Sequence, residues 1–413
     1  MTYSKASKRE RREMRKAMDG VCLRMKIRRM RSMRRMIRRR ASVVRETSGR
    51  RVSQHDGEKH RGMKTRVEEE LVQCSSSPRV YRECELYELA FSYRNVETEV
   101  EYLLAQYQRW NEVSTSSQDR SDGVPLCILE LGAGPAAHAI ETARQLEHTA
   151  SPTTVARLEH GGAIHCLDIE PCMRTLGLRR AAEAGVSLEY HIANMRAFEL
   201  DDNVQGRVEL AFCLLGSLAH LETVNDLLGF FASAHAAMRT GGILVLELEH
   251  PSNFLFCDQG DAQHRQSAGE SWYIEEEEDD DYDDSVSSRG PSATTSEARK
   301  RLGVSWGSAE DEVDPVAGIR RRTVGFTLYG EMRQTRDDEK DAHAKRRGGD
   351  RHVIEHWEEV VNARAITVPE LELLATKCSG FDIVEMHGEM ESSMDVPVDV
   401  EDAYRLVVTL RKR

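Results

Sequence analysis

Residues 127–135 read CILELGAGP, an apolar run that leads into a turn with two glycines. Glycine has no Cβ, so Gly132 and Gly134 would let a ligand approach the backbone closely. A helix is expected from Pro135, and its first turn would add free N–H groups facing the same ligand. Glu130 places a carboxylate two residues before the first glycine. Together these features predict a binding site for a nucleotide-containing cofactor.

The residues 132–137, GAGPAA, also match the relaxed dinucleotide pattern G-x-G-x-x-A, so an NAD(P)- or flavin-dependent oxidoreductase is one interpretation. In such a site an acid about 20 residues further on binds the ribose. Asp168 lies 36 residues after Gly132, so either cofactor would require a loop insertion near residues 148–162. The spacing therefore does not decide between cofactors.

Three features favour S-adenosylmethionine. Glu130 could face the ammonium group of the methionine moiety, at a position where an anionic pyrophosphate would be repelled. Asp168 ends an apolar run, and its carboxylate could accept both ribose hydroxyls. Asn194 and Met195 follow the next run and offer an amide for the adenine edge and an apolar side chain for its face. Asn194 could also simply cap a turn, and Met195 could belong to the core.

Strand-like and helix-like segments alternate along the chain, which is typical of a parallel sheet covered by helices on both faces. The expected strands are 126–131, 163–168, 186–192, 208–215, 243–248, 323–328, 353–361, 381–385 and 404–410. The expected helices are one around 96–107, one from Pro135, 171–185, 224–240 and one that a capping box, Thr367 with Glu370, opens and Gly380 closes. The link between the last two strands has no helical pattern, so these strands should form an antiparallel hairpin.

Four segments resemble, in order and placement, the motifs of class I S-adenosylmethionine-dependent methyltransferases: 128–135, 166–171, 194–198 and 238–246. Residues 87–94 resemble the tyrosine-containing segment of the branch that acts on small molecules, the methyltransferase-domain-25-like proteins. The likeness covers roughly residues 80–250 and, more loosely, 301–411. It implies a Rossmann-like α/β fold with a mostly parallel seven-stranded sheet, an antiparallel last strand, helices on both faces and extra strands in the C-terminal part.

The resemblance also implies roles for individual residues. The implied cofactor-binding residues are Glu130, Gly132, Ala133 and Gly134 at the methionine end, Asp168 with Ile169 at the ribose, Asn194 with Met195 at the adenine, and Leu214 beside the transferred methyl group. Two positions depart from the usual motifs. Ala136 stands at the third glycine, which a helix start tolerates, and Asn194 stands where an acid is frequent, although its amide can still accept a hydrogen bond from the adenine amino group.

Methyl transfer from a sulfonium is a direct displacement, so a general base is optional. His220 and His250 follow two of the expected central strands, at the carboxyl edge where ligands bind, and are candidate catalytic residues. Glu249 is a weaker candidate, and a single histidine in a loop is more often structural. Residues 303–330, which contain Trp306 and other aromatics, could cover the acceptor as a lid or an added sheet.

The charge is distributed unevenly. Residues 1–40 hold 17 Lys and Arg against three acids, a local charge of +14, and because the whole chain carries -12 the remaining 373 residues carry -26. Such a basic arm is typical of a disordered extension, an organelle-targeting segment or a nucleic-acid-binding tail. Residues 275–284 contain nine acids interrupted only by Tyr282, and self-repulsion predicts that they stay unfolded.

We therefore expect four regions: a basic, disordered arm (1–75), the cofactor-binding core (79–259), an acidic, disordered insertion (260–300) and a C-terminal part that completes the sheet and covers the acceptor (301–413). The nine cysteines are scattered without a C-x-x-C pair, which favours reduced thiols in an intracellular, most simply cytoplasmic, protein and argues against a zinc site. No apolar run is long enough for a membrane helix. The expected partner is a small-molecule acceptor; the alternatives are an RNA or protein methyltransferase that uses the basic arm, and a non-catalytic cofactor-binding protein.

Overall fold

The computed structural model describes residues 77–112, 126–149, 163–251, 270–275, 301–308, 310–330, 352–391, 397–398, 403 and 405–413. The basic arm predicted at 1–75, and the acidic insertion apart from residues 270–275, lie outside the described residues. No helix in the described ranges is both long and apolar enough to cross a membrane.

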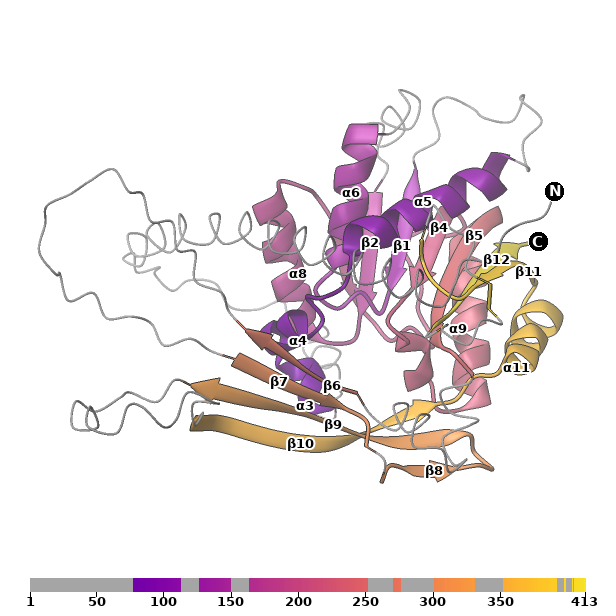
Figure 1. The fold of residues 1–413 in the computed structure, drawn as a ribbon. Coiled ribbons are helices and arrows are strands. Elements are labelled where there is room, and N and C mark those ends of the chain that lie inside the picture. Colours follow the sequence, from indigo (N-terminus) through magenta and orange to yellow (C-terminus); the bar gives the residue numbers. More distant parts are fainter. Residues whose placement is uncertain are drawn as a thin grey trace, which may run out of the picture. The chain divides into compact units, whose positions relative to one another are not determined.

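A seven-stranded sheet forms the centre of the fold, in the order β11-β12-β5-β4-β1-β2-β3 (Figure 1). Six strands run in one direction: β11 and the five neighbours β1 (Cys127–Leu131), β2 (Ala163–Asp168), β3 (Glu189–Ile192), β4 (Val208–Cys213) and β5 (Met238–Glu249). Strand β12 (Arg405–Lys412) runs antiparallel between β5 and β11 (Phe381–His387). The predicted mostly parallel sheet and its antiparallel terminal hairpin are confirmed.

Helices cover both faces of this sheet (Figure 1). Side chains of α5 (Val96–Glu112), α6 (Ala137–Thr149) and α8 (Pro171–Ala184) pack with Ile128 on one face. Side chains of α9 (Val224–Ala237), of α11 (Val368–Glu372) and of the π-helix η4 (Leu373–Cys378) pack with Leu129 on the other. Neighbouring β1 side chains thus enter opposite clusters, as the alternation along a strand requires. All five β1 residues are buried, which explains the continuous apolar run.

Several predicted boundaries shift. Helix α6 begins at Ala137 instead of Pro135, because Ala136 has a φ of +59° and its N–H closes a turn onto the Ala133 carbonyl. Strand β3 is shorter than expected and begins at Glu189. Helix α9 ends at Ala237, before the glycine pair, because Met238 already pairs with Val208 in the sheet. Sequence periodicity could not foresee these pairings, which depend on neighbouring strands.

The capping box at the start of α11 is half confirmed. The Thr367 side chain accepts the Glu370 backbone N–H at 3.4 Å, as predicted. The Glu370 carboxylate instead pairs with Arg364, 2.6 Å away. The helical stretch continues as η4 and ends before Gly380, whose φ is +78°.

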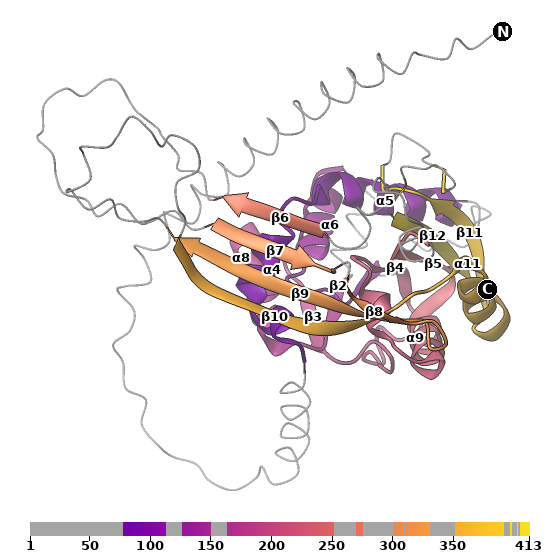
Figure 2. The same cartoon turned by 60° about the horizontal axis from the view of Figure 1, so that its bottom comes forward.

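A second, antiparallel sheet follows β5 in the chain (Figure 2). Its order is β10-β9-β7-β6, with β8 (Glu312–Asp314) paired to β9; the other strands are β6 (Glu270–Glu275), β7 (Arg301–Trp306), β9 (Ile319–Gly330) and β10 (His352–Arg364). Val80 and Ala90, from the short helices α3 (Arg79–Arg82) and α4 (Cys84–Ala90), pack into its apolar cluster. Of the two forms expected for residues 303–330, the structure has the added sheet.

Strand β6 corrects one prediction. Residues 270–275 belong to the stretch 260–300 that was expected to be a solvated insertion, yet they pair with β7 from Glu270 opposite Trp306 to Glu275 opposite Arg301. The Trp272 indole N–H donates to the Ala90 carbonyl at 2.8 Å, which ties the strand to α4. Trp272 and Ile274 alternate with more polar residues, as in a strand. This short pattern was not recognised because the acidic run 275–284 follows directly.

Candidate functional site

The two glycines after β1 occupy backbone conformations that other residues rarely adopt. Gly132 has a φ of +66° and Gly134 a φ of +51°. A Cβ on Gly132 would lie 3.0 Å from Ser217, so the turn is in close contact with the loop after β4. A Cβ on Gly134 would lie 3.9 Å from the ring of Tyr87, which places α4 beside the turn.

Neighbouring strands hold this turn in place. The Ala133 N–H donates to the Leu167 carbonyl at 3.0 Å, and the Gly134 N–H donates to the Asp168 carboxylate at 2.8 Å. The Tyr190 hydroxyl, from β3, donates to the Gly134 carbonyl. The structure therefore brings together the glycine turn and the acid that ends β2, as the sequence predicted from their places at the ends of neighbouring strands.

Asp168 accepts on both of its oxygens. Oδ2 takes the Gly134 N–H, and Oδ1 takes the Glu170 N–H at 2.9 Å. Burial raises the pKa of Asp168 above its ordinary value, while these two hydrogen bonds favour the charged form and oppose the shift. Ile169 follows at the start of the loop into α8 and is half-buried.

Glu130 lies beneath the turn and is directed at α6. Its Oε2 accepts the Ala139 N–H at 3.0 Å, and its Oε1 lies 3.7 Å from His138 Nδ1. The side chain is buried, and burial raises the pKa of Glu130 to about 7. The predicted contact between Glu130 and an ammonium group stays a prediction.

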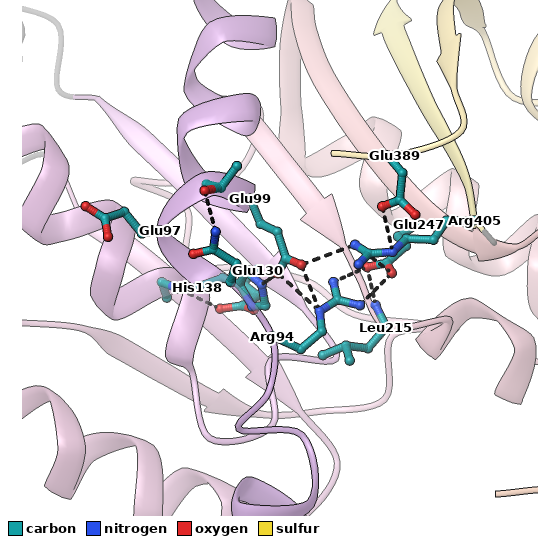
Figure 3. A network of polar contacts seen from close by, with 12 residues as sticks. Arg94, Glu97, Glu99, Glu130, His138, Leu215, Glu247, Glu389 and Arg405 are labelled. Carbon is teal, nitrogen blue, oxygen red and sulfur yellow. Dashed lines mark hydrogen bonds and ion pairs between the residues drawn. The ribbon is translucent and has the colours of Figure 1, made fainter. Parts of the chain in front are cut away.

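Glu130 stands at one end of a buried network of charged groups (Figure 3). His138 Nε2 lies 2.8 Å from a Glu99 oxygen, and the other Glu99 oxygen lies 2.9 Å from Arg94. Burial alone would raise the pKa of Glu99, but the His138 hydrogen bond and the Arg94 charge lower it to about 2. Glu99 therefore remains a carboxylate in the folded protein.

Arg94 extends the network to β5. Its two terminal nitrogens donate to the two Glu247 oxygens, each at 2.8 Å, in a bidentate ion pair whose side chains are at most 7% exposed (Figure 3). Burial opposes the Glu247 charge, but Arg94 lowers the pKa of Glu247 below its usual value. Arg405 of β12 also contacts Glu99 at 3.2 Å and Glu247 at 3.5 Å. The network thus joins the segment before α5 to three strands of the sheet.

The network ends at the loop after β4. Glu247 Oε2 accepts the backbone N–H of Leu215 at 2.9 Å, and Leu215 has a φ of +56°. Leu214, predicted to lie beside the methyl group, is buried, and its carbonyl accepts from the Ser217 N–H at 3.1 Å and hydroxyl at 2.8 Å. The structure gives the Leu214 side chain a packing role, and its predicted contact with the methyl group stays a prediction.

The adenine candidates lie in the loop after β3. Asn194 Oδ1 accepts the Arg196 N–H at 3.0 Å, so this oxygen closes a turn. Met195 is partly buried against the cluster that contains α9. Both residues follow β3 at the carboxyl edge of the sheet, and their adenine contacts stay predictions.

His220 is paired with a residue that sequence reasoning did not select. Its Nε2 lies 2.9 Å from the hydroxyl of Tyr81 in α3, and the two rings meet edge to face. His220 is exposed on one side, and the protein packed against its ring, with the nearby Arg322 charge, lowers the pKa of His220 to about 4. His220 is therefore neutral at neutral pH.

The two other candidate bases have structural partners. His250 Nε2 hydrogen-bonds to the Val398 carbonyl at 2.8 Å. Glu249 forms an ion pair with Arg322 at 2.6 Å and lies 3.6 Å from Arg320. These β9 arginines link the second sheet to the end of β5.

Sequence reasoning missed Tyr81, Arg94, His138 and Glu247. Glu247 alone left a signal, since it is a charged residue within an apolar strand, where a carboxylate must be paired. Tyr81 pairs with His220 and Arg94 pairs with Glu247 from distant parts of the chain, and the periodicity of the sequence does not indicate such pairs.

No family model matches this chain, and the comparison with curated proteins found no match either. Solved structures with a similar fold include an S-adenosylmethionine-dependent methyltransferase from Clostridium acetobutylicum, at 9% identity over 81% of this chain and 99% of that one, with a TM-score of 0.49. A sugar N-methyltransferase from a Streptoalloteichus species has 13% identity over 89% and 98% of the chains and a TM-score of 0.44. An amino pentose methyltransferase from Micromonospora echinaspora has 16% identity over 87% and 100%, with a TM-score of 0.40.

Strand order identifies the fold independently of these likenesses. A doubly wound dinucleotide-binding sheet is built from parallel strands joined by crossovers. Here β12 is antiparallel and lies between β5 and β11, which gives the order β3-β2-β1-β4-β5-β12-β11. The glycine turn and the acid that ends β2 meet at the carboxyl edge of this sheet. The chain has the fold of class I S-adenosylmethionine-dependent methyltransferases.

Proposed function

We propose that this protein is an S-adenosylmethionine-dependent methyltransferase that acts on a small-molecule acceptor. The bound cofactor would supply a methyl group that its sulfonium already activates. The protein then has to bind the donor, align the acceptor and exclude water. The residues around the glycine turn suit the first of these tasks.

This proposal rests on one observation: the backbone N–H groups at the glycine turn already donate hydrogen bonds within the protein. Ala133, Gly134 and Ala136 each donate to an acceptor within the protein, and Pro135 has no N–H. In the first turn of α6, the Ala139 N–H is taken by the Glu130 carboxylate. A pyrophosphate would need such N–H groups and would face two carboxylates there, so the arrangement argues against a dinucleotide.

A cationic donor with a ribose fits the same residues better. Backbone N–H groups, among them those of Gly134 and Glu170, occupy part of the Asp168 carboxylate, which can accept further hydrogen bonds from a ribose diol. Glu130, at the end of the buried network, provides negative charge near the methionine end when it is ionised. Asn194 and Met195 would hold the adenine from the loop after β3.

Tyr81 and His220 are suited to positioning the acceptor. The lowered pKa of His220 keeps its ring uncharged, so it would not repel a nearby sulfonium. The Tyr81–His220 hydrogen bond joins α3 to the loop after β4, at the edge of the sheet where the acceptor should approach. A proton released by the acceptor could pass to His220 Nε2 once the hydrogen bond between Tyr81 and this nitrogen has broken.

Contacts over the same edge support a small acceptor. The 3₁₀ turn Ser217–His220 is contacted by Tyr81, and Asn362 of β10 hydrogen-bonds to Glu222 at 3.0 Å just after it. Aromatic side chains from α4 and the second sheet pack together beside this region: Tyr87, Phe91, Trp272 and Trp306. Side chains packed against this edge would restrict access to it, which favours a small molecule over a folded polymer as the acceptor.

Calorimetry with the full chain tests the donor. We expect S-adenosylmethionine and S-adenosylhomocysteine to bind, NADH to give no heat, and Asp168→Ala to lose at least about tenfold in donor affinity. Glu312→Gln, at an exposed ion pair of β8, serves as the control and should bind normally. Binding of NADH but not of S-adenosylmethionine would overturn the proposal.

Incubation with donor labelled on its methyl group tests the acceptor. Small-molecule, RNA and protein fractions of a cell extract are compared as acceptors. We expect label in the small-molecule fraction, in amounts that fall with Tyr81→Phe. Label confined to RNA or protein would contradict the small-molecule assignment and favour one of the polymer substrates.

A further inference from the structure

Two cysteines that the proposed function does not use lie next to each other. Cys84 is the first residue of α4, and Cys172 is the second residue of α8. Both have free thiols and are half-buried, so small reagents can reach them. They are 88 positions apart in the sequence, and only the packing of α4 against α8 brings them together.

The contacts of the Cys172 thiol show where it lies relative to Cys84. Its Sγ donates toward the Tyr81 carbonyl at 3.5 Å and the Arg82 carbonyl at 3.4 Å, at the end of α3. The Arg82 carbonyl lies two residues before Cys84, so the Cys172 thiol lies beside the start of α4. Burial, followed by the Cys84 thiol, raises the pKa of Cys172 to about 12. Because Cys172 Sγ contacts the end of α3 and α4 packs against α8, the two thiols lie on facing ends of neighbouring helices, as a disulfide between them would require.

The elements that carry these thiols both border the candidate donor site. Helices α3 and α4 carry Tyr81, which contacts His220, and Tyr87, whose ring lies beside Gly134. Helix α8 begins three residues after Asp168. A covalent bond between the helices would tie the segment over the glycine turn to the strand end that carries the ribose-binding acid.

We propose that Cys84 and Cys172 form a reversible disulfide that locks α3 and α4 against α8, and that a low-molecular-weight disulfide such as oxidised glutathione is the oxidant. The formation of the bond is independent of the proposed function. Its effect on donor exchange rests on that function.

The reaction balances as a thiol–disulfide exchange. The Cys84 thiolate attacks one sulfur of oxidised glutathione, forms a mixed disulfide and expels one glutathione thiolate. Cys172 then loses its proton and attacks the Cys84 sulfur, which expels the second glutathione. Two thiols are oxidised, one glutathione disulfide is reduced to two thiols, and the Cys172 proton passes to the leaving thiolate.

The second step becomes easier once the first has occurred. Two of the influences that raise the pKa of Cys172 are the hydrogen bond and the charge interaction with Cys84. Both disappear when the Cys84 sulfur is part of a mixed disulfide. Burial and the Glu170 charge still raise the pKa of Cys172, and the entry of a glutathione molecule would reduce the burial.

The other described cysteines provide contrast. Cys127, Cys166 and Cys213 lie within central strands and are at most 3% exposed, so an oxidant cannot reach them. Cys378, at the end of η4, is exposed. Cys378 therefore serves as the control: it is an accessible thiol outside the Cys84–Cys172 pair.

The experiment treats the full chain with oxidised glutathione and maps its peptides without reduction. We expect a peptide containing Cys84 to be linked to one containing Cys172, and this link to be absent from Cys84→Ser and from Cys172→Ser. Cys378→Ser should keep it. Mixed glutathione adducts on Cys84 and Cys172 without a link, or links to other cysteines, would overturn the proposal.

Donor exchange is measured on the same samples. The oxidised wild type should release S-adenosylhomocysteine at least about tenfold more slowly than the reduced protein, and dithiothreitol should restore the rate. Oxidised Cys84→Ser should exchange at the reduced rate. A linked protein that exchanges normally would disprove the lock, whereas a linked protein that binds no donor in either state would leave the disulfide standing and refute the methyltransferase assignment.

Discussion

The Glu247 carboxylate accepts the Leu215 backbone N–H at 2.9 Å, and Leu215 has a φ of +56° in the loop after β4. A left-handed conformation costs a leucine roughly 1–2 kcal/mol, so this hydrogen bond holds a strained loop in place. Arg94 fixes the same carboxylate from the other side. The buried ion pair therefore shapes the edge of the sheet where an acceptor would approach.

Glu247→Gln should destabilise the fold by about 3 kcal/mol, because the Arg94 charge then loses its bidentate partner in a buried position. Urea unfolding measures the change. Glu312→Gln removes an exposed carboxylate paired with Arg321 and should change stability by less than about 0.5 kcal/mol. Equal effects of the two substitutions would mean that the buried network contributes no more than a surface pair.

The stability should depend on the titration of Glu130. Its pKa is about 7 in the folded protein against an ordinary value of 4.5, so the folded protein holds a proton that the unfolded chain releases. This contribution is complete below the unfolded pKa and is lost as the pH rises through the folded pKa. Wild type should therefore lose up to about 3 kcal/mol relative to Glu130→Gln between about pH 5 and pH 8. Parallel pH profiles of unfolding free energy would show that Glu130 does not titrate in this range.

The two glycines of the turn should differ in their response to alanine. Gly134→Ala should destabilise by about 1–2 kcal/mol, since its φ is +51° and the added Cβ would meet the Tyr87 ring only at ordinary contact distance. Gly132→Ala adds a clash with Ser217 at 3.0 Å and should cost more. Thermal unfolding of both variants checks the order. A less stable Gly134→Ala protein would mean that strain and packing at the turn are assigned to the wrong residues.

Tyr81→Phe should reduce methyl-transfer turnover about tenfold while donor affinity stays unchanged, because only the hydrogen bond to His220 is lost. Steady-state kinetics and calorimetry separate the two effects. Tyr329→Phe, in β9, is the control and should keep the wild-type rate. A parallel loss of donor affinity in Tyr81→Phe would show that Tyr81 supports the donor site instead of the acceptor.

The sequence was informative wherever one segment carried a complete local pattern. The apolar run of β4 and the glycine turn after β1 predicted the sheet and its carboxyl edge, and the short final link predicted the β11–β12 hairpin. Strand β6 was missed because its two apolar residues precede a dominant acidic run.

The contacts of the candidate site were beyond reach for another reason. Tyr81 meets His220 across 139 positions of sequence, and Arg94 meets Glu247 across 153. Such pairs depend on how α3, α5 and the sheet pack together, and local patterns in a single sequence do not predict that packing. The same limit applies to Ala136, whose positive φ follows from the turn it closes.

The second sheet also bears on how the chain folds. Strand β12 must find β5 across more than 150 residues, and closing so long a loop is slow. Strands β9 and β10 pair with each other over a short sequence distance, and Arg322 of β9 binds Glu249 at the end of β5. If this sheet forms early, the far end of β10 is already anchored near β5. The loop that must close before β12 pairs with β5 is then much shorter. The second sheet would then act as a folding scaffold for β12, the strand that distinguishes this fold.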